Sequence, residues 1–154
     1  MLEPGDAAPD FTLPDQSGEP VTLSELRGSH VVLYFYPKAD TPGCTTQACG
    51  MRDRAADLED ADAVVLGVSP DPPERLARFD AKHDLGFPLL SDADHAVAEA
   101  YGVWVHKPAR GYMKARMGIE RSTFVVDADG RLAKVLRKVK AQGHDELVLN
   151  ALAA

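Results

Sequence analysis

Two nearly uniform apolar runs, HVVLYFY at residues 30–36 and AVVLGVS at residues 63–69, interrupt an otherwise mixed sequence. Runs of this length that are rich in β-branched and aromatic residues are typical of strands covered on both faces. Between them, residues 44–60 repeat apolar positions with helical spacing. A strand, a helix and a second strand in this order predict a parallel pair joined by a right-handed crossover.

Weaker patterns predict further elements on either side of this unit. The segments DFTL and PVTL, separated by the turn DQSGE at residues 15–19, predict a short extended pair. Residues 71–84 predict a helix, because their prolines stand where a first helical turn tolerates them. Residues 92–102 predict another, because an aspartate begins the segment and Gly102 ends it. The longest predicted loop covers residues 105–118.

The last part of the chain completes the predicted fold. Residues 121–139 read as two strands around Asp129-Gly130, a strong hairpin signal, and residues 144–154 as an amphipathic helix. A βαβ unit followed by a hairpin and a last helix predicts the α/β class. The expected arrangement is thioredoxin-like, with a mixed central sheet flanked by helices and an N-terminal β-hairpin extension. A chain of 154 residues with 45% hydrophobic content supplies one core, so we expect a single domain over residues 1–154.

Charge and targeting signals narrow the classes of function. The formal net charge is −7, so we expect neither nucleic acid nor an anionic membrane as a partner. The N-terminal segment lacks the basic and apolar regions of a signal peptide, and no stretch of eighteen apolar residues occurs. We therefore expect a soluble cytoplasmic protein, in which cysteines are more often thiols than permanent disulfides.

The chain has only two cysteines, Cys44 and Cys49, and their spacing is unusual. Redox pairs and zinc knuckles mostly use C-x-x-C, which this pair does not match. Thr41 is suited to a helix N-cap and Pro42 to the first helical position, so Cys44 falls in the first turn. Free N–H groups at that positive end of a helix favour the thiolate over the thiol. Cys44 is therefore a candidate nucleophile.

Cys49 lies on the same predicted helix, about 7.5 Å further along its axis at a rise of about 1.5 Å per residue. A disulfide needs Cα atoms about 4.4 to 6.8 Å apart, so the pair cannot bond while the helix is intact. Gly50 follows directly and weakens the helix there. The spacing suits two cysteines that meet only after the helix has partly unwound.

The flanks of Cys44 resemble a known family. PKADTPGC at residues 37–44 matches the peroxiredoxin pattern P-x-x-x-T-x-x-C through Pro37, Thr41 and Cys44. The chain is similar over nearly its whole length to the bacterioferritin comigratory protein, or peroxiredoxin Q, branch of that family. The supporting stretches are GDAAPDFTLPDQSGE, YFYPKADTPGCTTQACGMRD, LLSDADHAVAEAYGVW and GIERSTFVVDADG, the last of which contains Arg121.

The resemblance implies a thiol-dependent peroxidase that acts on hydrogen peroxide and organic hydroperoxides. Cys44 would be the peroxidatic cysteine, whose thiolate attacks the peroxide and becomes sulfenic acid. Thr41 would hydrogen-bond the sulfur and the peroxide, Pro37 would shield the thiolate from water, and Arg121 would stabilise the thiolate and the transition state. The backbone N–H groups of Gly43 and Cys44 would complete the peroxide site.

The same resemblance implies how the cycle closes. Cys49 would be the resolving cysteine, giving an intramolecular disulfide that thioredoxin, or alternatively glutaredoxin, reopens. Neither a metal nor an organic cofactor is implied, and we expect a monomer, with a dimer as the alternative. Gln47 departs from much of the wider family, where an acidic residue is common at this place. A neutral amide can still hold a hydrogen-bond network near Arg121.

Other interpretations of the same residues remain open at this level. A lone cysteine is more often a small buried apolar residue, Arg121 could be an ordinary surface arginine, and Thr41 could be only a helix cap. Two rival functions are a dithiol oxidoreductase acting on protein disulfides, which C-x-x-C would favour, and a non-catalytic redox sensor or holdase. The histidines have no metal-ligand spacing, and we expect them to be solvated: His30, His83, His95, His106 and His144.

Overall fold

The computed structural model describes residues 1–153, and its centre is a five-stranded mixed sheet in the order β5-β4-β3-β8-β9. β3, β4 and β5 run parallel, and β8 and β9 add to them in antiparallel fashion. The mixed sheet predicted from the sequence is confirmed. The strands are β3 (His30–Phe35), β4 (Ala63–Ser69), β5 (Leu89–Ser91), β8 (Ser122–Val126) and β9 (Leu132–Leu136).

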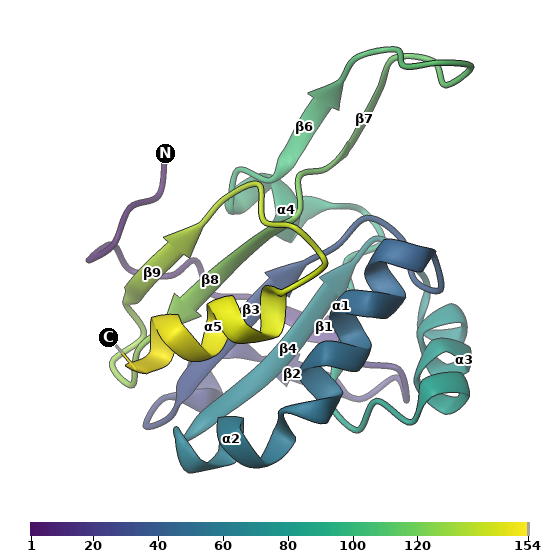
Figure 1. Ribbon diagram of the computed structural model, residues 1–154. Coiled ribbons are helices and arrows are strands. Elements are labelled where there is room, and N and C mark those ends of the chain that lie inside the picture. The colour runs from purple at the N-terminus through teal and green to yellow at the C-terminus, as the bar shows by residue number, and fades with distance from the viewer. Residues whose placement is uncertain (154) are drawn as a thin grey trace.

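Helices cover both faces of this sheet (Figure 1). α1, α2, α3 and α5 lie on the face that receives Val32, Tyr34 and Tyr36, whereas α4 and the N-terminal segment cover the opposite face. Because both faces are covered, successive side chains of β3 are buried alternately in two apolar clusters. The helices are η1 (Leu23–Leu26), α1 (Pro42–Asp53), α2 (Ala55–Asp60), α3 (Pro73–His83), α4 (Ala96–Ala100) and α5 (His144–Ala153).

Two short antiparallel pairs lie outside the central sheet. β1 (Thr12–Pro14) pairs with β2 (Pro20–Thr22), which confirms the predicted N-terminal hairpin. β6 (Trp104–Lys107) pairs with β7 (Arg116–Ile119), so the prediction of a loop over residues 105–118 is wrong. Figure 1 shows this second hairpin projecting away from the body of the molecule. Since its strands pair only with each other, they need no apolar periodicity.

Residues 44–60 form two helices rather than the single predicted helix. The break falls at Arg54, whose backbone angles of φ −104° and ψ 17° leave the helical region. The helix predicted over residues 92–102 is shorter, because α4 begins at Ala96 with His95 at its N-cap. The carboxylate of Asp92, four residues before α4, still accepts hydrogen bonds from the N–H groups of Val97 and Ala98 at 3.2 and 2.8 Å. Gly102, at φ +72°, ends that helical segment as predicted.

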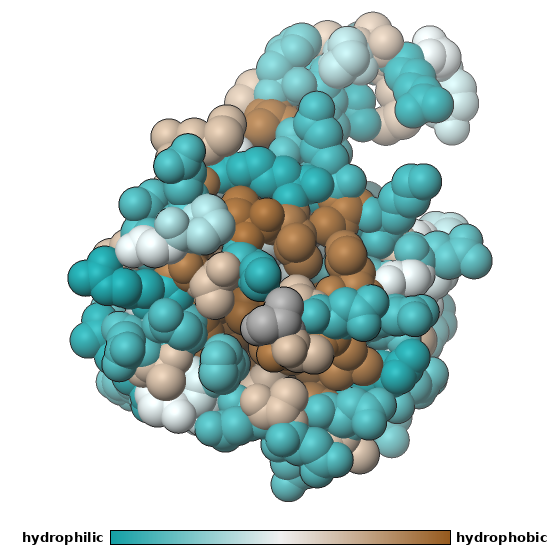
Figure 2. All heavy atoms as spheres, turned by 60° about the vertical axis from the view of Figure 1, so that its left-hand side comes forward, coloured by the Kyte–Doolittle hydropathy of each residue, from teal (hydrophilic) through white to brown (hydrophobic). Residues whose placement is uncertain are grey.

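β5 and β9 are the two edge strands of the sheet, and the N-terminal segment pairs with the start of β9 through hydrogen bonds between Gly5, Asp6 and Leu132. Figure 2 shows an apolar area bordered by hydrophilic side chains, and a groove of about 570 Å³ lies beside β9 and α5. Val135, Leu136 and Leu147 are among its lining residues. Lys138 and Lys140, which follow the end of β9, also line it.

Candidate active site

Cys44 is the third residue of α1 and is buried, with 2% of its surface exposed. β3 ends at Phe35, so the short connection to α1 brings Cys44 to the carboxyl end of a central strand, as the sequence predicts. Thr41 occupies the predicted N-cap position in an extended conformation. Its hydroxyl donates to the carbonyl of Lys38 at 2.8 Å and does not cap the helix. The first turn of α1 therefore receives no side-chain acceptor from Thr41.

Arg121 reaches this sulfur from the segment between β7 and β8. Its Nη2 lies 3.3 Å from Sγ of Cys44, and its Nη1 donates to Oε1 of Gln47. Gln47 is three residues after Cys44 on the same helix, so both side chains face the guanidinium. A neutral amide thus holds Arg121 in place, and the fork of the guanidinium serves the thiol and the amide together.

The loop before α1 is held by two residues that the sequence analysis missed. The buried carboxylate of Asp71 accepts a hydrogen bond from the N–H of Ala39 at 2.7 Å and one from the hydroxyl of Ser69 at 2.8 Å. Arg75 lies 3.2 Å from Asp71 and also donates to the carbonyl of Ala39 at 3.2 Å. The i, i+4 spacing of this acid and base at the start of α3 was a signal for the ion pair, but not for its contact with the loop.

A groove of about 480 Å³ leads from Arg121 to the root of the β6–β7 hairpin. Its apolar lining includes Pro37, Val105 and Ile119. Pro37 and Arg121 thus line the same groove. The long side chains of Lys107 and Lys138 make part of the remaining wall basic.

Lys107 is a further charged residue that the sequence analysis missed. Burial lowers the pKa of its ammonium, and the positive charges of Arg116 and Arg121 lower it further. Cys44 and Glu120 act in the opposite direction. Lys107 is the last residue of β6, and its ammonium interacts electrostatically with the buried Cys44 thiol.

Cys49 lies further along α1 and is half-buried, and neither cysteine is bonded to another. Both are on one continuous helix, as predicted. Gly50 faces α5, where a Cβ atom at this position would lie 3.5 Å from Cβ of Asp145. Asp145 also forms an ion pair of 3.1 Å with Arg54, directly after α1. The start of α5 therefore holds the part of α1 that must open if the two cysteines are to meet.

His144 is buried with 1% of its surface exposed, so the prediction that the histidines are all solvated is wrong. Its Nε2 lies 2.7 Å from the hydroxyl of Thr123, and its ring packs 5.6 Å from that of Tyr34 between centroids. Burial lowers the pKa of His144 to about 4, the charge of Arg121 contributes in the same direction, and Asp145 opposes both. The imidazole of His144, buried close enough to Arg121 to be affected by its charge, is therefore neutral at pH 7.

Trp104 does not enter the site, because its ring stacks on His95 at 4.0 Å between centroids.

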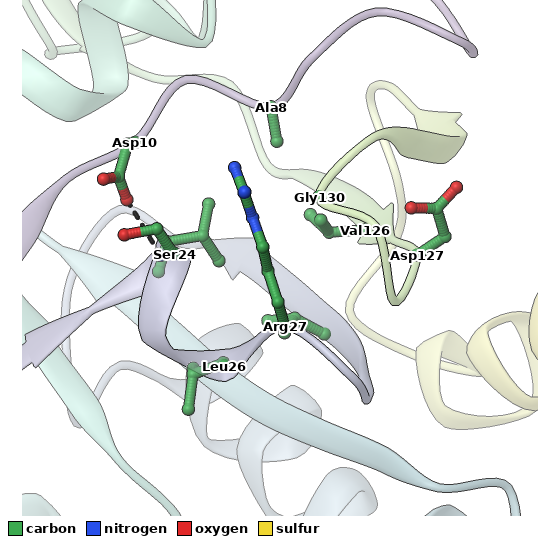
Figure 3. A pocket seen from close by; sticks show the side chains of 10 residues that line it. Ala8, Asp10, Ser24, Leu26, Arg27, Val126, Asp127 and Gly130 are labelled. Atoms are coloured by element: carbon green, nitrogen blue, oxygen red, sulfur yellow. Dashed lines mark hydrogen bonds between the residues drawn. The ribbon is translucent and has the colours of Figure 1, made fainter.

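Figure 3 shows a separate cavity, lined by Ala8, Asp10, Arg27 and Gly130 among others, whose volume is about 20 Å³. Val31, near the start of β3, also lines it, about 13 Å from the end of that strand at about 3.3 Å per residue. A space of this size holds about one water, so the cavity has no part in the site.

Residues 1–153 contain no group of three or more His, Cys, Asp or Glu side chains that could hold a metal ion. Over the same residues, no helix has both the length and the apolar character needed to cross a bilayer.

Residues 4–135 of this chain, which include Cys44, Gln47 and Arg121, match the AhpC/TSA family. This chain is a peroxiredoxin of that family. It is 51% identical to peroxiredoxin Bcp of Escherichia coli K12 over 98% of this chain and 96% of the relative. Peroxiredoxin Bcp of Bacillus subtilis is 49% identical over 98% of this chain and 95% of its own.

Solved structures agree with this assignment and confirm the thioredoxin-like peroxiredoxin fold. The bacterioferritin comigratory protein of Xanthomonas campestris, studied for its alkyl peroxide reduction activity, superposes with a TM-score of 0.90 at 39% identity, covering 99% of this chain and 96% of that one. A peroxiredoxin Q variant of Xylella fastidiosa gives a TM-score of 0.92 at 36% identity over 99% and 96% of the two chains. This peroxiredoxin thus groups with the bacterioferritin comigratory protein and peroxiredoxin Q branch.

Proposed function

We propose that this peroxiredoxin is a thiol peroxidase that reduces hydrogen peroxide and organic hydroperoxides at Cys44 and is recycled by thioredoxin. The contact of 3.3 Å between Arg121 and the Cys44 sulfur is the observation that carries the proposal. A permanent positive charge at that distance stabilises a thiolate and the negative charge that moves onto the leaving oxygen. The alkyl peroxide reduction activity of the Xanthomonas relative supports the inclusion of organic hydroperoxides.

In the first step, the Cys44 thiolate attacks one oxygen of the peroxide. A sulfur–oxygen bond forms, the O–O bond breaks, and the other oxygen takes a proton and leaves as water or an alcohol. The sulfur loses two electrons to the peroxide and becomes sulfenic acid. Thr41 and the N–H groups of Gly43 and Cys44 orient the peroxide, while Pro37 keeps bulk water away.

In the second step, the Cys49 thiol attacks the sulfenic sulfur after α1 has partly unwound. A sulfur–sulfur bond forms and the hydroxyl leaves as water, so the disulfide stores the two oxidising equivalents. A dithiol of the thioredoxin type, or glutaredoxin as the alternative, then reduces it by exchange. This cycle needs a reducing compartment, and we expect the cytoplasm.

A coupled assay with thioredoxin, thioredoxin reductase, NADPH and peroxide tests the proposal directly. We expect many turnovers for the parent protein and none for Cys44→Ser. Insulin reduction in place of peroxide consumption would favour a dithiol oxidoreductase. Oxidation that stops after a single turnover, with thioredoxin present in excess, would favour a redox sensor.

Intact mass after a stoichiometric amount of peroxide tests the role of Cys49. The parent should lose two hydrogens, whereas Cys49→Ser should gain one oxygen at Cys44 and then over-oxidise. A parent protein that gains oxygen and never forms the internal bond would contradict the two-cysteine scheme.

A further inference from the structure

The β6–β7 hairpin has a composition unlike that of the rest of the chain. Residues 100–119 contain no acidic side chain, although the whole chain has 24 acidic residues against 17 Lys and Arg. The hairpin carries four of those cations: Lys107, Arg110, Lys114 and Arg116. A protein with a net charge of −7 thus has a locally positive projection beside its active site.

The same hairpin exposes its large apolar side chains. Every residue from 108 to 117 is exposed, and Tyr112, at the tip, is exposed to 100%. Met113 and Met117 are exposed to 45% and 48%. The tip is a tight turn, in which Arg110 and Met113 exchange backbone hydrogen bonds of 2.9 Å on either side of Gly111 and Tyr112. An amphipathic aromatic ring therefore lies at the end of a hydrogen-bonded basic hairpin.

We propose that this hairpin docks the peroxiredoxin on anionic lipid bilayers, with the tip around Tyr112 in the headgroup region. Basic side chains are attracted to anionic headgroups, and aromatic and apolar side chains between them enter the interface. Docking itself does not depend on the proposed function, whereas the delivery of hydroperoxides to Cys44 does. Docking by the tip would hold the groove at the root of the hairpin, lined by Val105, Ile119 and Arg121, near the bilayer, where it can receive hydroperoxides that leave the bilayer.

The acidic body does not oppose this docking, because of the length of the hairpin. The tip lies at least four residues beyond the root, which at about 3.3 Å per residue is about 13 Å. The Debye length at physiological ionic strength is about 8 Å, so the acidic body is largely screened from the surface that the tip contacts. The expectation of no membrane partner was based on the net charge of the whole chain. Binding by the tip depends instead on the local charge of the hairpin, which is positive.

Vesicle sedimentation of the full chain tests the proposal. Vesicles of phosphatidylcholine with phosphatidylglycerol should sediment the protein at low ionic strength, whereas vesicles of phosphatidylcholine alone should not, and high salt should release it. Each Lys or Arg near such a surface contributes about a fivefold increase in binding, so Arg110→Gln with Lys114→Gln should weaken binding about 25-fold. Tyr112→Ala should weaken it further.

Arg78→Gln is the matched control, because Arg78 is an exposed cation on α3, away from the hairpin. It should bind vesicles as the parent does, and all four proteins should consume hydrogen peroxide at the same rate in solution. Equal binding by the parent and the hairpin variants, or no binding to anionic vesicles at low salt, would overturn the proposal. Capture of a protein or nucleic acid by the hairpin without vesicle binding would overturn it as well. A parent protein that binds anionic vesicles but does not consume peroxide would instead contradict the proposed function alone.

Discussion

Arg121 is the residue on which the site depends most directly, because its guanidinium contacts both the sulfur of Cys44 and the amide of Gln47. Arg121→Lys keeps the positive charge but replaces a planar fork with one ammonium, which cannot reproduce both contacts. We expect the second-order rate constant with hydrogen peroxide to fall about 100-fold, as when a transition-state donor is lost. Stopped-flow measurement of Cys44 oxidation gives that constant. A variant as fast as the parent would show that the charge alone is sufficient.

His144 makes a separate prediction about stability. Its pKa falls from 6.5 to about 4 because the folded protein buries the neutral imidazole. Between those pH values the unfolded chain binds a proton that the folded protein does not, so stability falls as the pH decreases. A shift of this size corresponds to a loss of about 3 kcal/mol between pH 7 and pH 4. Urea unfolding at several pH values should show this slope.

The control for that prediction removes the titrating group. His144→Gln retains a side chain that can hydrogen-bond Thr123, but it cannot bind a proton in this range, so its stability should depend less steeply on pH. His106→Gln, at an exposed position on the hairpin, should keep the slope of the parent. Identical slopes for the parent and His144→Gln would mean that acid sensitivity comes from the carboxylates.

At the scale of the elements, the contact between α1 and α5 controls how readily the two cysteines can meet. Gly50→Ala should stabilise α1 by about 1 kcal/mol, because glycine weakens a helix interior by that amount relative to alanine. The new methyl group would lie 3.5 Å from Asp145, an ordinary contact. We expect disulfide formation after peroxide addition to slow about fivefold and over-oxidation to increase. Rapid quenching followed by intact mass measures both quantities.

Asp145→Asn provides the opposite change at the same contact. It removes the ion pair with Arg54, which is partly exposed, so we expect an effect of only about twofold, toward faster disulfide formation. The first oxidation of Cys44 should be unchanged in both variants, since neither position touches the sulfur. If Gly50→Ala forms the disulfide between Cys44 and Cys49 at the parental rate, opening of α1 does not limit the cycle.

The elements also show what the sequence could and could not predict. The strands at residues 30–36 and 63–69 were predicted within one residue, because burial on both faces leaves an unbroken apolar run. β5 was missed because three residues are too few to show a pattern. The β6–β7 hairpin was interpreted as a loop, because strands that project into water carry charges instead of an apolar alternation.

Long-range contacts at the site were the other gap in the prediction. Cys44 and its helix start follow from local residues, whereas Arg121 was assigned through a family resemblance. The burial of His144 depends on Thr123, which is 21 positions away in the sequence, and no local pattern reports that contact. Similarly, Asp71 reaches Ala39 only because β3 and β4 are neighbours in the sheet.

At the scale of the whole molecule, the stable body and the projecting hairpin are separable. Lys107 pairs with Arg116 across the ribbon, and everything between them is exposed. Replacing residues 108–115 by Asn-Gly should therefore leave a hairpin with a two-residue turn of the favoured type. The buried root, including Ile119, and the groove beside Arg121 would remain.

Because the removed tip buries almost no apolar surface, the melting temperature of this shortened protein should stay within about 2 °C of the parent. Its rate with hydrogen peroxide in solution should be unchanged, while binding to anionic vesicles should be lost. Calorimetry, stopped-flow oxidation and vesicle sedimentation measure the three quantities on the same sample. A slower reaction with hydrogen peroxide would show that the tip contributes to the chemistry at Cys44, and a large decrease in melting temperature would show that it packs on the body. Retained vesicle binding would contradict docking by the hairpin and would direct attention to the groove beside β9 and α5, which Lys138 and Lys140 line.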